Sequence, residues 1–182
     1  MTSTGQSARN AAVFWQLIAR LDWTQEGDDD AVIAPVVEAL SQGPVADIEQ
    51  FEETLAEYLY ALDTREHARY GFLGEADPDD GESYISADFF LYLRCVVVAN
   101  GKKFYDKVLA DPTQMPRDLE FESLLAISHE AYSAKTGEEL AYDTRLSYES
   151  YSNEAGWAST ADTTSGTFTS EAVPPGNRRP AE

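Results

Sequence analysis

The chain has 182 residues and a formal net charge of −20 at pH 7, from 33 acidic and 13 basic side chains. A surface this acidic repels phosphate backbones and anionic lipid headgroups, so we expect no direct binding of nucleic acid or membranes. The one cysteine excludes an intramolecular disulfide, and no apolar run approaches the ~20 residues that span a bilayer. Because the N-terminus also lacks a secretory signal pattern, the sequence predicts a cytoplasmic protein. We also expect no cofactor.

Apolar residues recur at three- and four-residue spacing over three stretches in the first part of the chain. They predict helices from Asn10 to about Trp23, from Ala31 to Ser41, and from Val45 to Leu73 with or without a break at Asp63-Thr64. Residues 1–9 carry no such pattern, and we expect them to form a flexible N-terminus.

The run from Ser86 to Pro112 predicts a helical hairpin in the core. Ser86 can cap a first helix, and Asn100-Gly101 can turn left-handed and end it. A second short helix follows and stops at Pro112. The preceding residues 74–83 are rich in Asp, Pro and Gly, which is typical of a surface loop.

Beyond the hairpin, the pattern predicts one more long helix and then loses its regularity. The helix runs from about Leu119 to Lys135, with Gly137 as its stop. We expect an irregular arm from residue 138 to 157 and a flexible tail rich in Ser, Thr, Gly and Pro at 158–182. The predicted fold is therefore all-α: a single domain of about six helices over residues 10–157.

Four stretches carry a further pattern: Phe14 to Ile18, Ile48 to Glu52, Ser86 to Pro112, and Glu122 to Gly137. Together they resemble a bacterial family known as domain of unknown function 4240, over roughly Ala12 to Trp157. The central hairpin is the most specific element of this resemblance. The resemblance implies an α-helical fold and a bacterial source, and it implies no activity.

Common metal-binding and catalytic motifs are absent from the sequence. A calcium loop starting at Asp77 needs glycine where Glu82 stands, and a zinc-protease helix starting at His129 needs a second histidine where Ser133 stands. No serine-hydrolase elbow, phosphate-binding lysine loop or dinucleotide-binding glycine turn is present. We therefore expect no metal site.

The remaining reactive side chains favour structural interpretations. Cys95 lies in an apolar helix and is interpreted as a small buried residue. We expect His67 on a helix surface and His129 to be partly packed. The adjacent carboxylates of Glu52 and Glu53 are interpreted as part of a solvated face.

Arg94 is the polar residue that stands out, because it interrupts the apolar central helix. A buried guanidinium needs a carboxylate or carbonyl partner, so we expect an internal ion pair with Asp88 or with an acidic residue of the third helix. The alternative is an anion-binding residue that lines a pocket.

Two functions follow from these observations. The first is a non-catalytic module that binds or regulates another, basic protein through acidic helical faces, as an immunity or antitoxin-like protein does. The second is an enzyme of unrecognised type with a pocket beside Arg94, His129 and Tyr132. The acidity itself fits either a basic partner or a general solubility feature.

Overall fold

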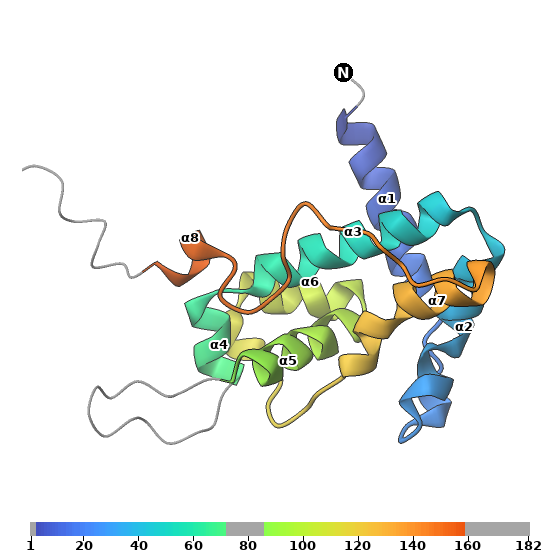
Figure 1. Cartoon of the computed structure of the whole chain (residues 1–182). Coiled ribbons are helices and arrows are strands. Elements are labelled where there is room, and N and C mark those ends of the chain that lie inside the picture. Colours follow the sequence, from blue (N-terminus) through green and yellow to red (C-terminus); the bar gives the residue numbers. More distant parts are fainter. Residues whose placement is uncertain (1–2, 72–85, 159–182) are drawn as a thin grey trace, which may run out of the picture.

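The computed structural model describes residues 3–71 and 86–158 (Figure 1). The α-helices in this part of the chain are α1 (Ser3–Ile18), α2 (Asp29–Gln42), α3 (Val45–Leu62), α4 (Arg65–Gly71), α5 (Ala87–Ala99), α6 (Lys102–Ala110), α7 (Ile127–Thr136) and α8 (Glu154–Trp157). Three short 3-10 helices are η1 (Trp23–Gln25), η2 (Pro112–Gln114) and η3 (Glu122–Ala126). These residues contain no strand, so the all-α prediction is confirmed, with more helices than expected.

Helix α3 is the central element, and α1, α2, α5 and α7 all pack against it (Figure 1). Its apolar stripe is buried as the spacing predicts; the buried members are Ile48, Phe51, Leu55, Leu59 and Leu62. Each such side chain contributes about 1.5–3 kcal/mol by leaving water. The bundle is therefore organised around the clearest amphipathic pattern in the sequence.

The central hairpin is confirmed as α5 and α6. The Ser86 hydroxyl accepts a hydrogen bond from the Phe89 N–H, with 3.4 Å between the two heavy atoms. Asn100 caps the end of α5, and Gly101 turns the chain with a φ of 87°, which an L side chain rarely adopts. After α6, Pro112 begins η2.

The ends of the first helix differ from the prediction. Helix α1 begins at Ser3, whereas the apolar pattern placed its start at Asn10. A hydrogen bond of 2.8 Å from the Gln6 amide to the Asn10 side chain supports the added turns. The helix ends at Ile18 because Asp22 caps the separate short helix η1 that follows.

Several other boundaries can be compared directly. The break at Asp63-Thr64 is present, because α3 ends at Leu62 and α4 begins at Arg65. The helix predicted from Leu119 starts later and in two pieces, η3 and then α7. The predicted loop with its Asp77 calcium candidate and residues 159–182 of the predicted tail lie outside the described residues. No described helix has the length and apolar character needed to cross a membrane.

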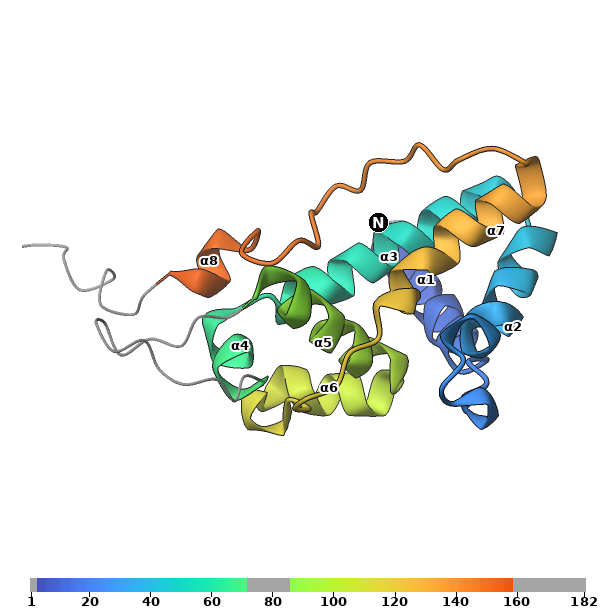
Figure 2. The ribbon, with the colours of Figure 1, turned by 60° about the horizontal axis from the view of Figure 1, so that its bottom comes forward.

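The predicted irregular arm is confirmed; we call residues 138–157, including the short α8, the C-terminal arm. Figures 1 and 2 show it running alongside α3 from the end of α7 to α8. From residue 139 to 151 its side chains alternate between exposed and half-buried, as in an extended chain. The half-buried ones in this stretch are Leu140, Tyr142, Thr144, Leu146, Tyr148 and Ser150. No residue of the arm is fully buried, so the arm lies on the bundle and is not part of its interior.

Candidate functional site

The four residues proposed from the sequence do not come together. Arg94 is fully buried in α5, whereas Asp88 is exposed in the first turn of the same helix. His129 is exposed on α7, so the expectation that it is partly packed is wrong. Tyr132 is half-buried against the apolar core. None of the four lines either of the two surface hollows described below.

Arg94 hydrogen-bonds to neutral oxygens. Its guanidinium donates to the main-chain carbonyl of Leu59 at 2.8 Å, to that of Tyr148 at 2.9 Å and to the Ser150 hydroxyl at 3.0 Å. The expected ion pair with Asp88 is wrong, because carbonyl groups already face the guanidinium and the Asp88 side chain points to solvent. Two of the three acceptors belong to the C-terminal arm, so Arg94 links α5 to the arm.

Asp63, at the C-cap of α3, is a fully buried carboxylate that also holds the arm. One oxygen accepts from the Tyr151 N–H at 3.0 Å and from the Trp157 indole N–H at 2.8 Å. The other accepts from the Asn153 N–H at 2.9 Å. Burial lowers the pKa of Arg94, and the nearby Asp63 charge opposes that shift. Asp63 therefore interacts with Arg94 electrostatically, although no direct ion pair joins them in the described part of the chain.

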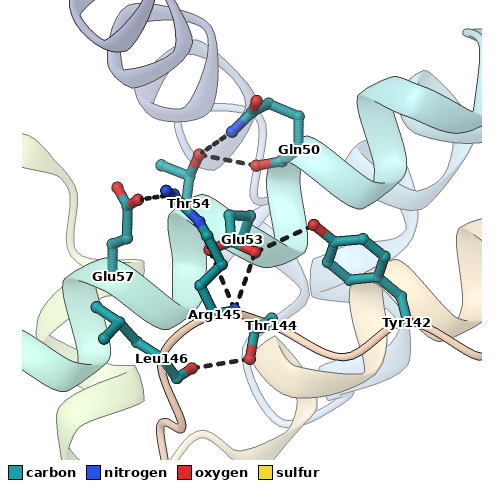
Figure 3. Close-up of polar contacts among 8 residues, drawn as sticks. All are labelled: Gln50, Glu53, Thr54, Glu57, Tyr142, Thr144, Arg145 and Leu146. Carbon is teal, nitrogen blue, oxygen red and sulfur yellow. Dashed lines mark hydrogen bonds and ion pairs between the residues drawn. The ribbon is translucent and has the colours of Figure 1, made fainter. Parts of the chain in front are cut away.

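Glu53 holds the beginning of the arm from the middle of α3 (Figure 3). Its carboxylate accepts from the Tyr142 hydroxyl at 3.0 Å, from the Arg145 N–H at 3.3 Å and from the Arg145 Nε at 2.7 Å. The same guanidinium donates to Glu57 at 2.6 Å. Burial opposes ionisation of Glu53, but the Arg145 hydrogen bonds outweigh it and lower its pKa.

Glu52 is buried as well, so the interpretation of Glu52 and Glu53 as a solvated face is wrong. Both side chains are about 5% exposed or less. Glu53 lies under the arm, and Glu52 lies beside Ser128 and His129 of α7 and Tyr148 of the arm. Burial raises the pKa of Glu52, while the Ser128 hydroxyl and the charge of His129 oppose the shift. Its Oε2 atom and the Ser128 Oγ atom both lack a hydrogen-bond partner.

Among the other reactive side chains, one prediction is confirmed and another is wrong. Cys95 is fully buried, and burial raises the pKa of its thiol to about 12. His67, expected on a surface, is 4% exposed. Its Nδ1 lies 2.7 Å from the Thr64 hydroxyl and its Nε2 lies 3.2 Å from the Val108 carbonyl oxygen. Burial lowers the pKa of His67, so this imidazole joins α4 to α6 in its neutral form.

The larger surface hollow, which we call the acidic groove, has a volume of about 1010 Å³ and lies between α1, α3 and the arm. Its charged and hydrogen-bonding lining includes Asn10, Glu49, Glu53, Glu57, Tyr142 and Arg145. A second hollow of about 310 Å³ lies between α1, α2 and α3 and is lined in part by Val13, Leu17 and Phe51. Within the described residues, no group of three or more His, Cys, Asp or Glu side chains is placed to hold a metal ion.

The acidic groove is suited to binding cations. Glu53 and Glu57 lie one helical turn apart on α3, and together they already hold the Arg145 guanidinium. Glu49 lies one turn before Glu53 on the same helix face, and its lining position adds a third carboxylate to the groove.

Sequence reasoning missed Glu52, Glu53 and Asp63 because it treated the arm as an accessory. One signal was available: between Leu140 and Tyr148, apolar or aromatic side chains recur mostly at every second position. That period is typical of an extended segment with one buried face. An extended segment on a helical bundle has no strand partner, so its N–H and C=O groups need polar side chains of the bundle.

The comparisons with known proteins identify one family. The model of the family described as "Protein of unknown function (DUF4240)" matches residues 10–134, which is more than half of the chain. No curated protein and no solved structure matches the chain. The match includes α3 and α5 and ends before the arm begins. The chain therefore belongs to the DUF4240 family of proteins of unknown function.

Proposed function

We propose that the protein is a non-catalytic protein-binding module that takes a basic partner in the acidic groove. The main support for the proposal is the pairing of the Arg145 guanidinium with two carboxylates of α3. The guanidinium bridges the buried Glu53 and the half-exposed Glu57, at 2.7 and 2.6 Å. A groove that holds one arginine of its own chain has the geometry to hold arginine or lysine side chains of another protein.

The charge of the whole chain supports the same proposal. A net charge of −20 attracts a basic partner over a distance and speeds the encounter at low ionic strength. A protein that covers the basic surface of its partner in this way regulates that partner by occlusion, as an immunity or antitoxin-like protein does. A cytoplasmic location in a bacterial cell belongs to this proposal.

The alternative, an enzyme with a pocket beside Arg94, His129 and Tyr132, has less support. A catalytic site needs reactive groups that converge on a cavity. Arg94 is buried and engaged with main-chain carbonyls, while His129 is exposed on another helix. These groups do not share a hollow, so binding is the better explanation of the geometry.

The test is a binding titration with an arginine-rich synthetic peptide as the probe, at low and high salt. We expect the double substitution Glu49→Gln/Glu57→Gln to weaken binding about fivefold at low salt, since two partly exposed ion pairs contribute about 1 kcal/mol. The matched control is Glu26→Gln/Glu120→Gln, which removes two exposed carboxylates that line neither hollow. Equal weakening by both pairs would contradict the proposal, because it would show attraction to net charge alone.

A further inference from the structure

Three charged side chains of the bundle bind the main chain of the C-terminal arm. Glu53 accepts from the N–H of Arg145, Arg94 donates to the carbonyl of Tyr148, and Asp63 accepts two N–H groups further along the arm. The contacts at Arg145 and Tyr148 hold backbone atoms of the alternating part of the arm, whereas those of Asp63 hold the turn before α8, where Tyr151 has a φ of 73°. Backbone contacts of this kind leave most of the side-chain sequence free. Charge-assisted hydrogen bonds of this kind are about twice as strong as neutral ones.

The arm has the properties of a bound peptide. Its inward side chains alternate along an extended backbone, and none is fully buried. Its apolar anchors Leu140, Tyr148 and Trp157 pack against the core from outside. Its one basic side chain, Arg145, is 73% exposed yet reaches the carboxylates of α3 (Figure 3).

Two observations distinguish the arm from an integral part of the core. The family match at residues 10–134 supplies Glu53, Arg94 and Asp63 but ends before the arm. In addition, Arg94, which donates to the arm, keeps an Nε atom with no hydrogen-bond partner, although its side chain is fully buried. Buried polar groups are normally paired, so the arm leaves one donor of this guanidinium unused.

We propose that the face formed by Glu53, Arg94 and Asp63 is a binding groove for an extended peptide. The arm fills this groove in cis, and an extended segment of a basic partner, with an arginine in the place of Arg145, fills it once the arm is displaced. The inference deepens the proposed function and rests on it, because it states how the partner's basic side chain reaches Glu53 and Glu57.

Displacement of the arm has a natural pivot. Gly137 ends α7 with a φ of 76°, and the arm begins directly after it. Because the arm competes from within the same chain, the apparent dissociation constant of an outside peptide equals its intrinsic value divided by the fraction of molecules in which the arm is open. Substitutions that weaken the arm and leave the groove unchanged must therefore strengthen binding in trans.

The test uses the full chain and a fluorescein-labelled synthetic peptide with the sequence of residues 138–158. We expect the substitutions Arg145→Ala/Trp157→Ala in the full chain to tighten peptide binding at least about tenfold over wild type, because they remove arm contacts to Glu53 and Asp63. Adding Asp63→Asn to that chain removes an acceptor from the groove and should abolish the gain. The control Asp143→Ala/Glu149→Ala changes two exposed arm residues and should bind like wild type.

Circular dichroism and thermal unfolding establish that each variant is folded, and Arg145→Ala alone replaces the double variant if that one is not. If a folded variant with a weakened arm binds the peptide no more tightly than wild type, the inference is overturned. It is also overturned if no arm variant folds, because an exchangeable arm is dispensable for folding. If the arginine-rich probe binds the acidic groove of the wild-type chain while the arm variants show no gain, the proposed function stands and only this inference fails.

Discussion

The α5–α6 hairpin and the C-terminal arm both attach to α3, but different forces hold them. The hairpin buries most of the side chains of α5, including the fully buried Cys95, Val97 and Val98. The arm buries none completely and depends on a few hydrogen bonds to Glu53, Asp63 and Arg94. Burial of apolar area is non-directional and spread over many contacts, whereas the arm is fixed at a few points.

This difference predicts different responses to single substitutions. Loss of one apolar side chain in the hairpin lowers the stability of the whole bundle, because the cavity lies in a shared core. Loss of one contact at the arm releases the arm locally and leaves the bundle folded, since local opening costs less than global unfolding. The arm is therefore the region that can change state without unfolding the protein.

The largest expected effect is on the hairpin side. Leu93→Ala, at a side chain that is 1% exposed, should lower the free energy of unfolding by about 2–5 kcal/mol. Urea unfolding followed by circular dichroism measures it. The control Leu119→Ala removes a leucine that is 53% exposed and should change stability by less than about 0.5 kcal/mol. Similar losses in the two variants would show that α5 is not part of a shared core.

On the arm side, Asp63→Asn should act locally. The new amide places an N–H₂ group against main-chain N–H donors of the arm, such as that of Asn153. We expect arm amides to exchange with solvent about thirtyfold faster, a loss of about 2 kcal/mol of local stability, measured by hydrogen exchange and mass spectrometry. Asp143→Asn, exposed on the arm, is the matched control. Unchanged arm exchange in the Asp63 variant would contradict the role of this carboxylate.

The sequence predicts the hairpin better than the arm for a physical reason. Apolar periodicity is a local pattern, and Ser86, Gly101 and Pro112 mark the starts and ends of helices locally. Both can therefore be recognised without knowledge of the rest of the fold. The partners of Arg94 at Tyr148 and Ser150 are more than fifty positions away along the chain. No local pattern connects an extended segment to charges on a distant helix.

Three assignments of burial were wrong, for Glu52 with Glu53, for His67 and for His129, because each depends on contacts with other parts of the chain. The segment around Glu52 is polar, which predicts a solvated face, because nothing in that segment indicates that α7 and the arm cover it. The sequence predicts an exposed His67 because α4 is short and has few apolar neighbours in sequence. In the structure, Val108 of α6 lies against the His67 imidazole. Cys95 was predicted correctly because its neighbours in sequence are also its neighbours in space.

Glu52 provides a pH-dependent test of whether α7 and the arm together shield this face of α3. Burial raises its pKa, with His129 and Ser128 on α7 and Tyr148 on the arm opposing the shift and Glu53 adding to it. The folded state then binds the Glu52 proton more tightly than the unfolded state, so this group's contribution to stability falls as pH rises from the unfolded pKa to the raised folded pKa. Glu52→Gln should therefore gain stability relative to wild type as pH increases.

Thermal unfolding of both chains between about pH 4 and about pH 8 measures this difference. The gain should be absent at the acid end, where the wild-type carboxyl is protonated in both states, and present at neutral pH. Glu120→Gln, an exposed carboxylate, serves as the control. A stability difference between wild type and Glu52→Gln that does not change with pH would show that Glu52 titrates as if solvated, and that α7 and the arm do not shield it.

The smallest expected effect is at an exposed ion pair of the hairpin. Lys102 pairs with Asp106 one turn along α6, and both side chains are more than half exposed. An exposed pair at this spacing contributes about 0.3–0.5 kcal/mol, so Lys102→Ala should scarcely change the urea midpoint. Arg145 is similarly exposed, but its partner Glu53 is only about 6% exposed, and Arg145→Ala should speed exchange of the arm amides well beyond any effect of Lys102→Ala on α6. A contact that fixes the arm to the bundle must change how often the arm opens when that contact is removed. If both substitutions leave amide exchange unchanged, Arg145 lies beside the carboxylates but does not hold the arm.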